Sequence, residues 1–94
     1  MSGIQELDLE HLTSKIILVT GASRGIGRAI AEKLLNLGNI VIGTSRRVES
    51  LSGLSTAFEK TFYPFELELN SPESVNALAK TVGDAFGKLD VLVN

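Results

Sequence analysis

A strand-like run, a glycine-rich turn and an amphipathic segment follow one another near the start of the chain. Residues 16–19 (IILV) are continuously apolar, as expected of a strand buried on both faces of a sheet. They lead directly into residues 20–27 (TGASRGIG). A glycine turn between a strand and a helix N-terminus offers backbone N–H groups to a dinucleotide pyrophosphate. This order of segments predicts a parallel α/β fold with a phosphate-binding turn.

Two segments have the apolar spacing of helices. The first is interrupted only by Lys33, and Gly38 predicts its end. Its stripe consists of Ile26, Ala29, Ile30, Lys33, Leu34 and Leu37. The second begins at Ser71-Pro72-Glu73, with a capping hydroxyl followed by proline, and Gly87 predicts its end. Its stripe consists of Val75, Leu78, Ala79, Val82 and Phe86.

Three further strands are expected after the first, which covers residues 16–20. Residues 40–45 and 89–94 are runs typical of buried strands. Residues 64–69 alternate in polarity, and because proline is tolerated at the first position of a strand, this strand is expected to begin near Pro64. Residues 48–60 have helical spacing diluted by serines and Gly53, which predicts a short or frayed helix.

The resulting order, β-α-β-α-β-α-β, predicts a Rossmann-like doubly wound parallel sheet of which only the N-terminal part is present. The expected strand order is 3-2-1-4, with the switch point between the first and fourth strands. Ligands bind at the carboxyl ends of strands near such a point, where the glycine turn lies. We divide the chain into a leader, residues 1–14, and a partial NAD(P)-binding Rossmann domain, residues 15–94.

Composition narrows the possible partners. The 94 residues suffice for one small domain, and a net charge of −2 with scattered basic residues argues against nucleic-acid binding. The chain has no cysteine, and His11 alone cannot build a metal site. No apolar run approaches the roughly 20 residues of a membrane helix. The acidic N-terminus lacks the features of a secretory signal, so a cytoplasmic location is expected.

The glycines at 21, 25 and 27 have the spacing G-x-x-x-G-x-G. Glycine permits the sharp turn out of the strand and lets the backbone approach a pyrophosphate closely. A glycine-rich turn that binds nothing is the alternative interpretation, but the strand before it and the helix after it favour dinucleotide binding. The run lacks the Gly-Lys-Ser/Thr of a nucleoside triphosphatase loop, which argues against that chemistry.

The end of the second strand indicates which dinucleotide is bound. Folds that bind NAD usually place an acid there, about 20 residues past the turn, to hold the ribose 2′-OH. Here the sequence is Thr44-Ser45-Arg46-Arg47, with no acid before Glu49. A hydroxyl and a guanidinium would instead bind a 2′-phosphate, and Arg24 could approach it too. The alternative is a solvated pair of arginines; the missing acid favours NADP(H) over NAD(H).

Together these residues resemble the short-chain dehydrogenase/reductase family, and within it the 3-oxoacyl-carrier-protein-reductase-like members. The resemblance is carried by residues 15–27, 69–75 and 89–94, the last being similar to the start of the family's Asn-Asn-Ala-Gly motif. It implies that the pyrophosphate and adenosine ribose would be surrounded by Gly21, Ser23, Gly25, Ile26 and Gly27. It implies a 2′-phosphate at Arg24, Ser45 and Arg46. It also implies that Asn70 bonds the adenine and that Asn94 fixes the ribose and the fourth strand.

The departures from the family concern catalysis. The family's chain is well over twice as long, and its catalytic serine, tyrosine and lysine lie in the part that has no counterpart here. The one tyrosine, Tyr63, is followed four residues later by Leu67 rather than lysine. We therefore assign no catalytic residue and expect a truncated chain that is inactive alone.

Two other interpretations stay open. The chain could be a non-catalytic dinucleotide-binding module. It could also be a fragment that folds only by self-association, through an exposed fourth strand and a sheet face that the third helix covers only in part.

Overall fold

A computed structural model describes residues 12–67 and 72–93 of the chain. Four predictions lie wholly or largely outside these residues: the roles of Asn70 and Asn94, the capping hydroxyl of Ser71, and most of the leader.

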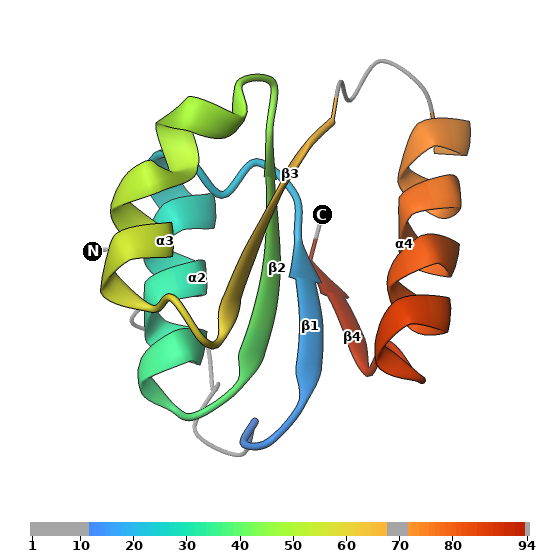
Figure 1. The fold of residues 1–94 in the computed structure, drawn as a ribbon, viewed down its shortest axis with the longest axis horizontal. Coiled ribbons are helices and arrows are strands. Elements are labelled where there is room, and N and C mark those ends of the chain that lie inside the picture. The colour runs from blue at the N-terminus through green and yellow to red at the C-terminus, as the bar shows by residue number, and fades with distance from the viewer. Residues whose placement is uncertain (1–11, 68–71, 94) are drawn as a thin grey trace.

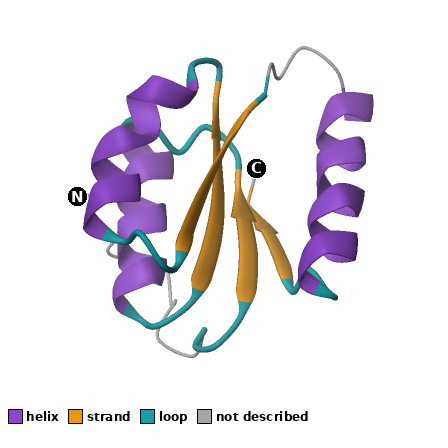
Figure 2. Cartoon of the chain, viewed as in Figure 1, coloured by secondary structure: helices purple, strands orange, loops and turns teal. Residues whose placement is uncertain are grey.

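The described residues form a parallel sheet of four strands (Figures 1 and 2). The strands are β1 (Ile16–Val19), β2 (Ile40–Ser45), β3 (Phe62–Glu66) and β4 (Val91–Val93). Their order is β3-β2-β1-β4, and every neighbouring pair is parallel. The predicted strand order and fold class are confirmed.

Four helical segments connect the strands. They are α2 (Gly25–Asn36), the 3₁₀ segment η1 (Val48–Leu51), α3 (Ser52–Ala57) and α4 (Pro72–Phe86). The segment predicted as a short or frayed helix is thus split into η1 and α3. Helices α2 and α3 lie on one face of the sheet and α4 lies on the other (Figure 1).

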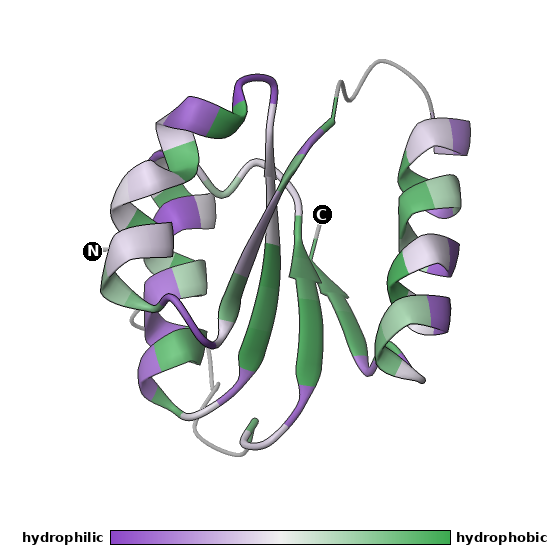
Figure 3. Ribbon diagram, in the orientation of Figure 1, coloured by the Kyte–Doolittle hydropathy of each residue, from purple (hydrophilic) through white to green (hydrophobic). Residues whose placement is uncertain are grey.

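Side chains that alternate along β1 fill two cores, one on each face of the sheet. Figure 3 shows the central strands β1 and β2 in the green of hydrophobic residues over much of their length. The core beneath α2 and α3 includes Ile17, Val19, Ala22, Ile30, Ala31, Leu34, Leu35, Val41, Leu51, Leu54 and Phe62. The core beneath α4 is smaller and is made of Ile16, Leu18, Ile42 and Val82. Three strand residues that register with this second face, Tyr63, Phe65 and Leu92, are each at least 36% exposed. Helix α4 therefore covers only part of its face.

The stripe predicted for the first helix is wrong at its start. Ile26 is 65% exposed, and the buried residues of α2 begin only at Ile30. The first turn of α2 follows the glycine turn beyond the end of β1, so it has no strand beneath it. Ala31 and Leu35, which the stripe omitted, take the buried positions.

Two strand boundaries also differ from the prediction. Strand β3 begins at Phe62, which puts Pro64 in its middle, and β4 is shorter than residues 89–94. The Thr61 carbonyl oxygen accepts a hydrogen bond from the Val41 N–H, and the Leu67 N–H donates one to the Ser45 carbonyl oxygen. The backbone groups of every second residue from Thr61 to Leu67 therefore point toward β2, and those of Pro64 point away from it. Because β3 is an edge strand, the missing N–H of Pro64 costs no ladder bond.

Candidate functional site

A pocket of about 780 Å³ opens at the carboxyl ends of β1 and β2. It is lined by Gly21, Ser23, Arg24, Thr44, Ser45, Arg46, Arg47, Ser50 and Leu67. Five of the residues predicted to bind a cofactor are therefore brought together: Gly21, Ser23, Arg24, Ser45 and Arg46. Their meeting follows from the parallel pairing of β1 with β2, which places the two strand ends side by side.

The glycine turn has a backbone that other residues would disturb. Gly21 and Gly25 have φ angles of 65° and 64°, in the left-handed region that favours glycine. A Cβ added at Gly27 would overlap the carbonyl group of Gly21. The turn can therefore pack closely against the start of α2 only because Gly27 has no side chain.

Thr44 anchors this turn to β2, a role that the sequence analysis missed. Its Oγ1 accepts a hydrogen bond from the Gly21 N–H at 3.1 Å, and its carbonyl oxygen accepts one from the Ala22 N–H at 2.8 Å. The Thr44 side chain is fully buried. The sequence offered one indication of this role, because Thr44 lies one residue before the predicted end of the strand. Only the register of β2 against β1 shows that Thr44 lies beside the turn.

Gly25, Ile26 and Gly27 form the first turn of α2 and do not line the pocket wall itself. This turn contains no acidic residue, and Arg24 at the N-cap makes no side-chain capping bond. The first N–H groups of a helix have no intrahelical acceptor, and the helix dipole adds partial positive charge there. The turn is thus suited to receive an anion, as a pyrophosphate-binding turn requires.

The pocket is basic where it meets the end of β2. Arg46 and Arg47 follow this strand, Arg24 lies in the glycine turn, and no Asp or Glu is among the described residues that line the pocket. All three arginines are exposed. Guanidinium groups bind phosphates through paired N–H donors, so this end favours a phosphate monoester over a neutral hydroxyl. Arg47, Ser50 and Leu67 were not predicted from the sequence.

The residues present fit NADP(H), since a turn for a pyrophosphate and a basic end for a further phosphate share one pocket.

No cluster of three or more potential metal ligands occurs among the described residues.

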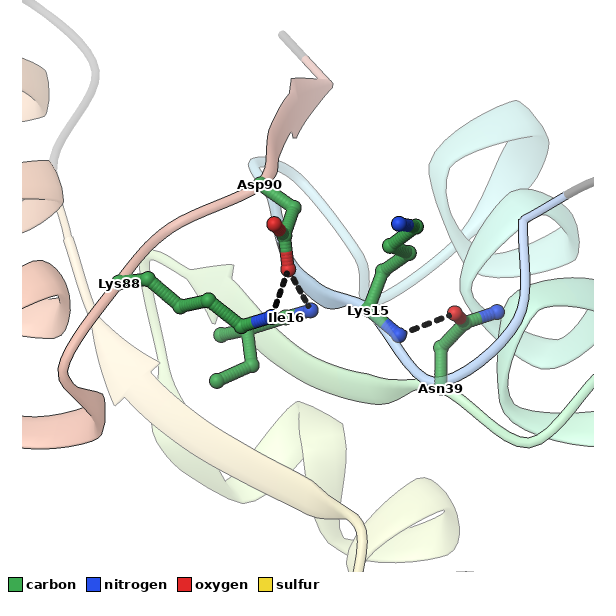
Figure 4. Close-up of polar contacts among 5 residues, drawn as sticks. All are labelled: Lys15, Ile16, Asn39, Lys88 and Asp90. Atoms are coloured by element: carbon green, nitrogen blue, oxygen red, sulfur yellow. Dashed lines mark hydrogen bonds and ion pairs between the residues drawn. The ribbon is translucent and has the colours of Figure 1, made fainter.

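A separate polar cluster lies at the amino ends of β1 and β4, at the opposite end of the strands from the pocket (Figure 4). The Asp90 carboxylate accepts a hydrogen bond from the Ile16 N–H at 2.8 Å and pairs with the Lys88 ammonium at 3.5 Å. The backbone bond is the main reason why the pKa of Asp90 lies below its ordinary 3.8; partial burial opposes it and Lys88 supports it. The cluster joins the start of β1 to the residue before β4, far from the pocket.

The sequence profile of the short chain dehydrogenase family matches residues 15–94. The chain belongs to this family. The glycine turn, the four parallel strands and the pocket therefore lie in the N-terminal part of a short-chain dehydrogenase.

Individual members of the short-chain dehydrogenase family are similar over most of the chain. A 3-oxoacyl-[acyl-carrier-protein] reductase of Vibrio harveyi is 44% identical over 84 residues, which cover 89% of this chain and 34% of that protein. The oxidoreductase BOA17 of Botryotinia fuckeliana is 40% identical over 82 residues, covering 86% of this chain and 30% of that protein. The chain thus spans about a third of the length of these relatives.

Solved short-chain dehydrogenases have the same fold. One from Streptomyces avermitilis has a TM-score of 0.78 and 42% identity, covering 83% of this chain and 29% of its own. A metagenomic short-chain oxidoreductase in complex with NADP has a TM-score of 0.77 and 38% identity, covering 86% of this chain and 38% of its own. Within residues 12–67 and 72–93, no helix is long and apolar enough to cross a membrane.

Proposed function

We propose that this chain binds the adenosine end of NADP(H) and is the cofactor-binding part of an NADP(H)-dependent short-chain oxidoreductase. The reaction of the whole protein would be the reduction of a carbonyl group or the oxidation of an alcohol. One observation carries the proposal: the pocket beside the glycine turn is lined by three arginines and, among the described residues, by no carboxylate. A carboxylate would repel a 2′-phosphate, whereas guanidinium groups bind it.

Each end of the pocket has its own task in this proposal. The turn from Gly21 to Gly27 and the first N–H groups of α2 would hold the pyrophosphate. Arg24, Ser45 and Arg46 would hold the 2′-phosphate. The nicotinamide of the bound cofactor would supply the hydride for carbonyl reduction or accept it in alcohol oxidation. The similarity to an oxidoreductase solved with NADP supports this choice of cofactor.

Catalysis is not assigned to this chain. Tyr63 lies on β3, donates a hydrogen bond to the Lys60 carbonyl oxygen at 3.3 Å and packs edge-on against Phe86, with ring centroids 5.1 Å apart. It does not line the pocket. These contacts give Tyr63 a packing role on the sheet face beneath α4, and we assign it no part in proton transfer. We propose that these 94 residues bind the cofactor without reducing a substrate, and that the protein works in the cytoplasm.

A second proposal concerns self-association. Among the described strands, β4 pairs only with β1, and Leu92 on β4 is 42% exposed. An apolar edge strand is a site for pairing with another chain. We propose that copies of this chain associate through β4 and the sheet face that α4 leaves uncovered.

A non-catalytic dinucleotide-binding module is the alternative to part of an oxidoreductase. The lining of the pocket supports cofactor binding in both cases.

The proposed cofactor preference is tested by calorimetric titration of the chain with NADP⁺ and with NAD⁺. The arginine end should make NADP⁺ bind at least about tenfold more tightly, because charge-assisted hydrogen bonds exceed the 1.4 kcal/mol that a tenfold change requires. Equal affinities would contradict the assignment of NADP(H).

The expected lack of turnover is tested in a separate assay with NADPH and a simple ketone. The absorbance of the reduced nicotinamide should fall no faster than in the protein-free blank. A faster loss would place catalytic groups in this chain.

A further inference from the structure

Hydrogen bonds among Ser45, Arg47 and Ser50 form a small ring next to Arg46 at the basic end of the pocket. The Ser50 Oγ donates to the Arg47 carbonyl oxygen at 2.6 Å, and the Ser50 N–H donates to the same oxygen at 3.1 Å. The Ser45 and Ser50 hydroxyl oxygens are 2.7 Å apart. The Arg47 N–H donates to the Ser45 Oγ at 3.3 Å. The ring therefore joins the end of β2 to η1 across the two arginines.

The number of protons sets the direction of these bonds. A carbonyl oxygen has no proton, so Ser50 must give its single hydroxyl proton to Arg47. The bond between the two hydroxyls must then be donated by Ser45 to Ser50. Ser45 in turn accepts from the Arg47 N–H. Each hydroxyl thus donates once and accepts once, and the Ser45 proton points to Ser50.

This arrangement clamps the backbone on both sides of Arg46. Ser45 precedes Arg46, Arg47 follows it, and both belong to the ring. Arg46 and Arg47 are themselves exposed, and a long exposed side chain loses freedom when it binds. A backbone that is already fixed removes part of this entropic cost of binding.

We propose that Ser50 is a positioning residue for recognition of a phosphate monoester on the ribose C2′. It acts through Ser45 and Arg47 by holding the β2–η1 loop in the shape that presents Arg46. The inference rests on the proposed function, because it assumes that the basic end receives the 2′-phosphate. It goes beyond it by assigning the recognition geometry to a hydroxyl three residues past the arginine pair.

The test compares Ser50→Thr with Ser50→Val, two side chains of nearly equal size that differ in the hydroxyl. Calorimetric titrations with NADP⁺ and NAD⁺ are run on both variants, on the unchanged chain and on Ser52→Ala, an exposed serine of α3 that does not line the pocket. Ser50→Val should weaken NADP⁺ binding about three- to tenfold, the effect of losing one or two hydrogen bonds, and leave NAD⁺ binding unchanged. Ser50→Thr and Ser52→Ala should bind both cofactors normally.

Other results overturn the inference in distinguishable ways. If Ser50→Val binds NADP⁺ normally while Arg46→Ala loses affinity, the proposed function stands and the role of Ser50 is wrong. If Ser50→Val weakens both cofactors equally, the hydroxyl has a general structural role only. If the unchanged chain does not prefer NADP⁺, both proposals fail. A thermal melt of each variant identifies any loss of folding, and Ser50→Ala, with a smaller side chain, replaces Ser50→Val should that variant not fold.

Discussion

At the scale of single residues, the clearest expectation concerns Arg46, which lines the basic end of the pocket. Replacing Arg46 with alanine should cost about 1.5–3 kcal/mol of NADP⁺ binding free energy, the usual size of a hydrogen bond to a charged group. NAD⁺ affinity should barely change, because the ribose 2′-OH has no charge. Calorimetric titration of the variant with both cofactors measures this difference.

Arg28→Ala is the matched control for this change. Arg28 also carries a guanidinium near the pocket end of α2, but it pairs with Glu32 at 2.9 Å and does not line the pocket. It should bind NADP⁺ as the unchanged chain does. An equal loss of NADP⁺ and NAD⁺ affinity in Arg46→Ala would show that Arg46 does not contact the 2′-phosphate.

At the scale of elements, Asp90 fastens the start of β1 to the approach of β4 (Figure 4). Its folded-state pKa lies below the ordinary 3.8, so the folded state prefers the carboxylate. The resulting stability is therefore complete above the unfolded-state pKa and is lost as pH falls through the folded-state value. Between pH 5 and pH 3, the unfolding free energy from urea denaturation should fall more steeply for the unchanged chain than for Asp90→Asn.

Asp84→Asn, an exposed position on α4, serves as the control for charge alone. Its dependence on pH should follow that of the unchanged chain. If Asp90→Asn also follows the unchanged chain across this range, the bond from the Ile16 N–H does not depend on the charge of Asp90.

At the scale of the whole molecule, the described residues leave one sheet face and one sheet edge incompletely covered. Leu92 lies on both, because it belongs to β4 and registers with Leu18 of the smaller core. Sedimentation velocity at micromolar concentration should reveal dimers or larger species, since exposed apolar strands pair with one another. Leu92→Lys should shift the chain toward monomers. A clean monomer of the unchanged chain would contradict association through β4.

Local chemistry explains how much of the fold the sequence predicts. Glycine at 21, 25 and 27 permits a turn that other residues cannot form, and apolar periodicity distinguishes helices from strands without knowledge of their partners. Right-handed crossovers then leave few strand orders for such a chain, so 3-2-1-4 could be derived and is confirmed. The same reasoning brings Arg24 and Arg46 to one pocket, as found. The binding roles of all these residues stay predictions.

What only the tertiary structure decided depends on contacts between distant segments. Ile26 has helical spacing but no strand beneath it, and Pro64 fits inside β3 only because its nitrogen faces the open edge. Thr44 and Ser50 look like ordinary polar residues until strand register and the β2–η1 loop supply their partners. Spacing along a chain determines which side of an element a residue occupies, but the neighbour on that side is chosen by packing.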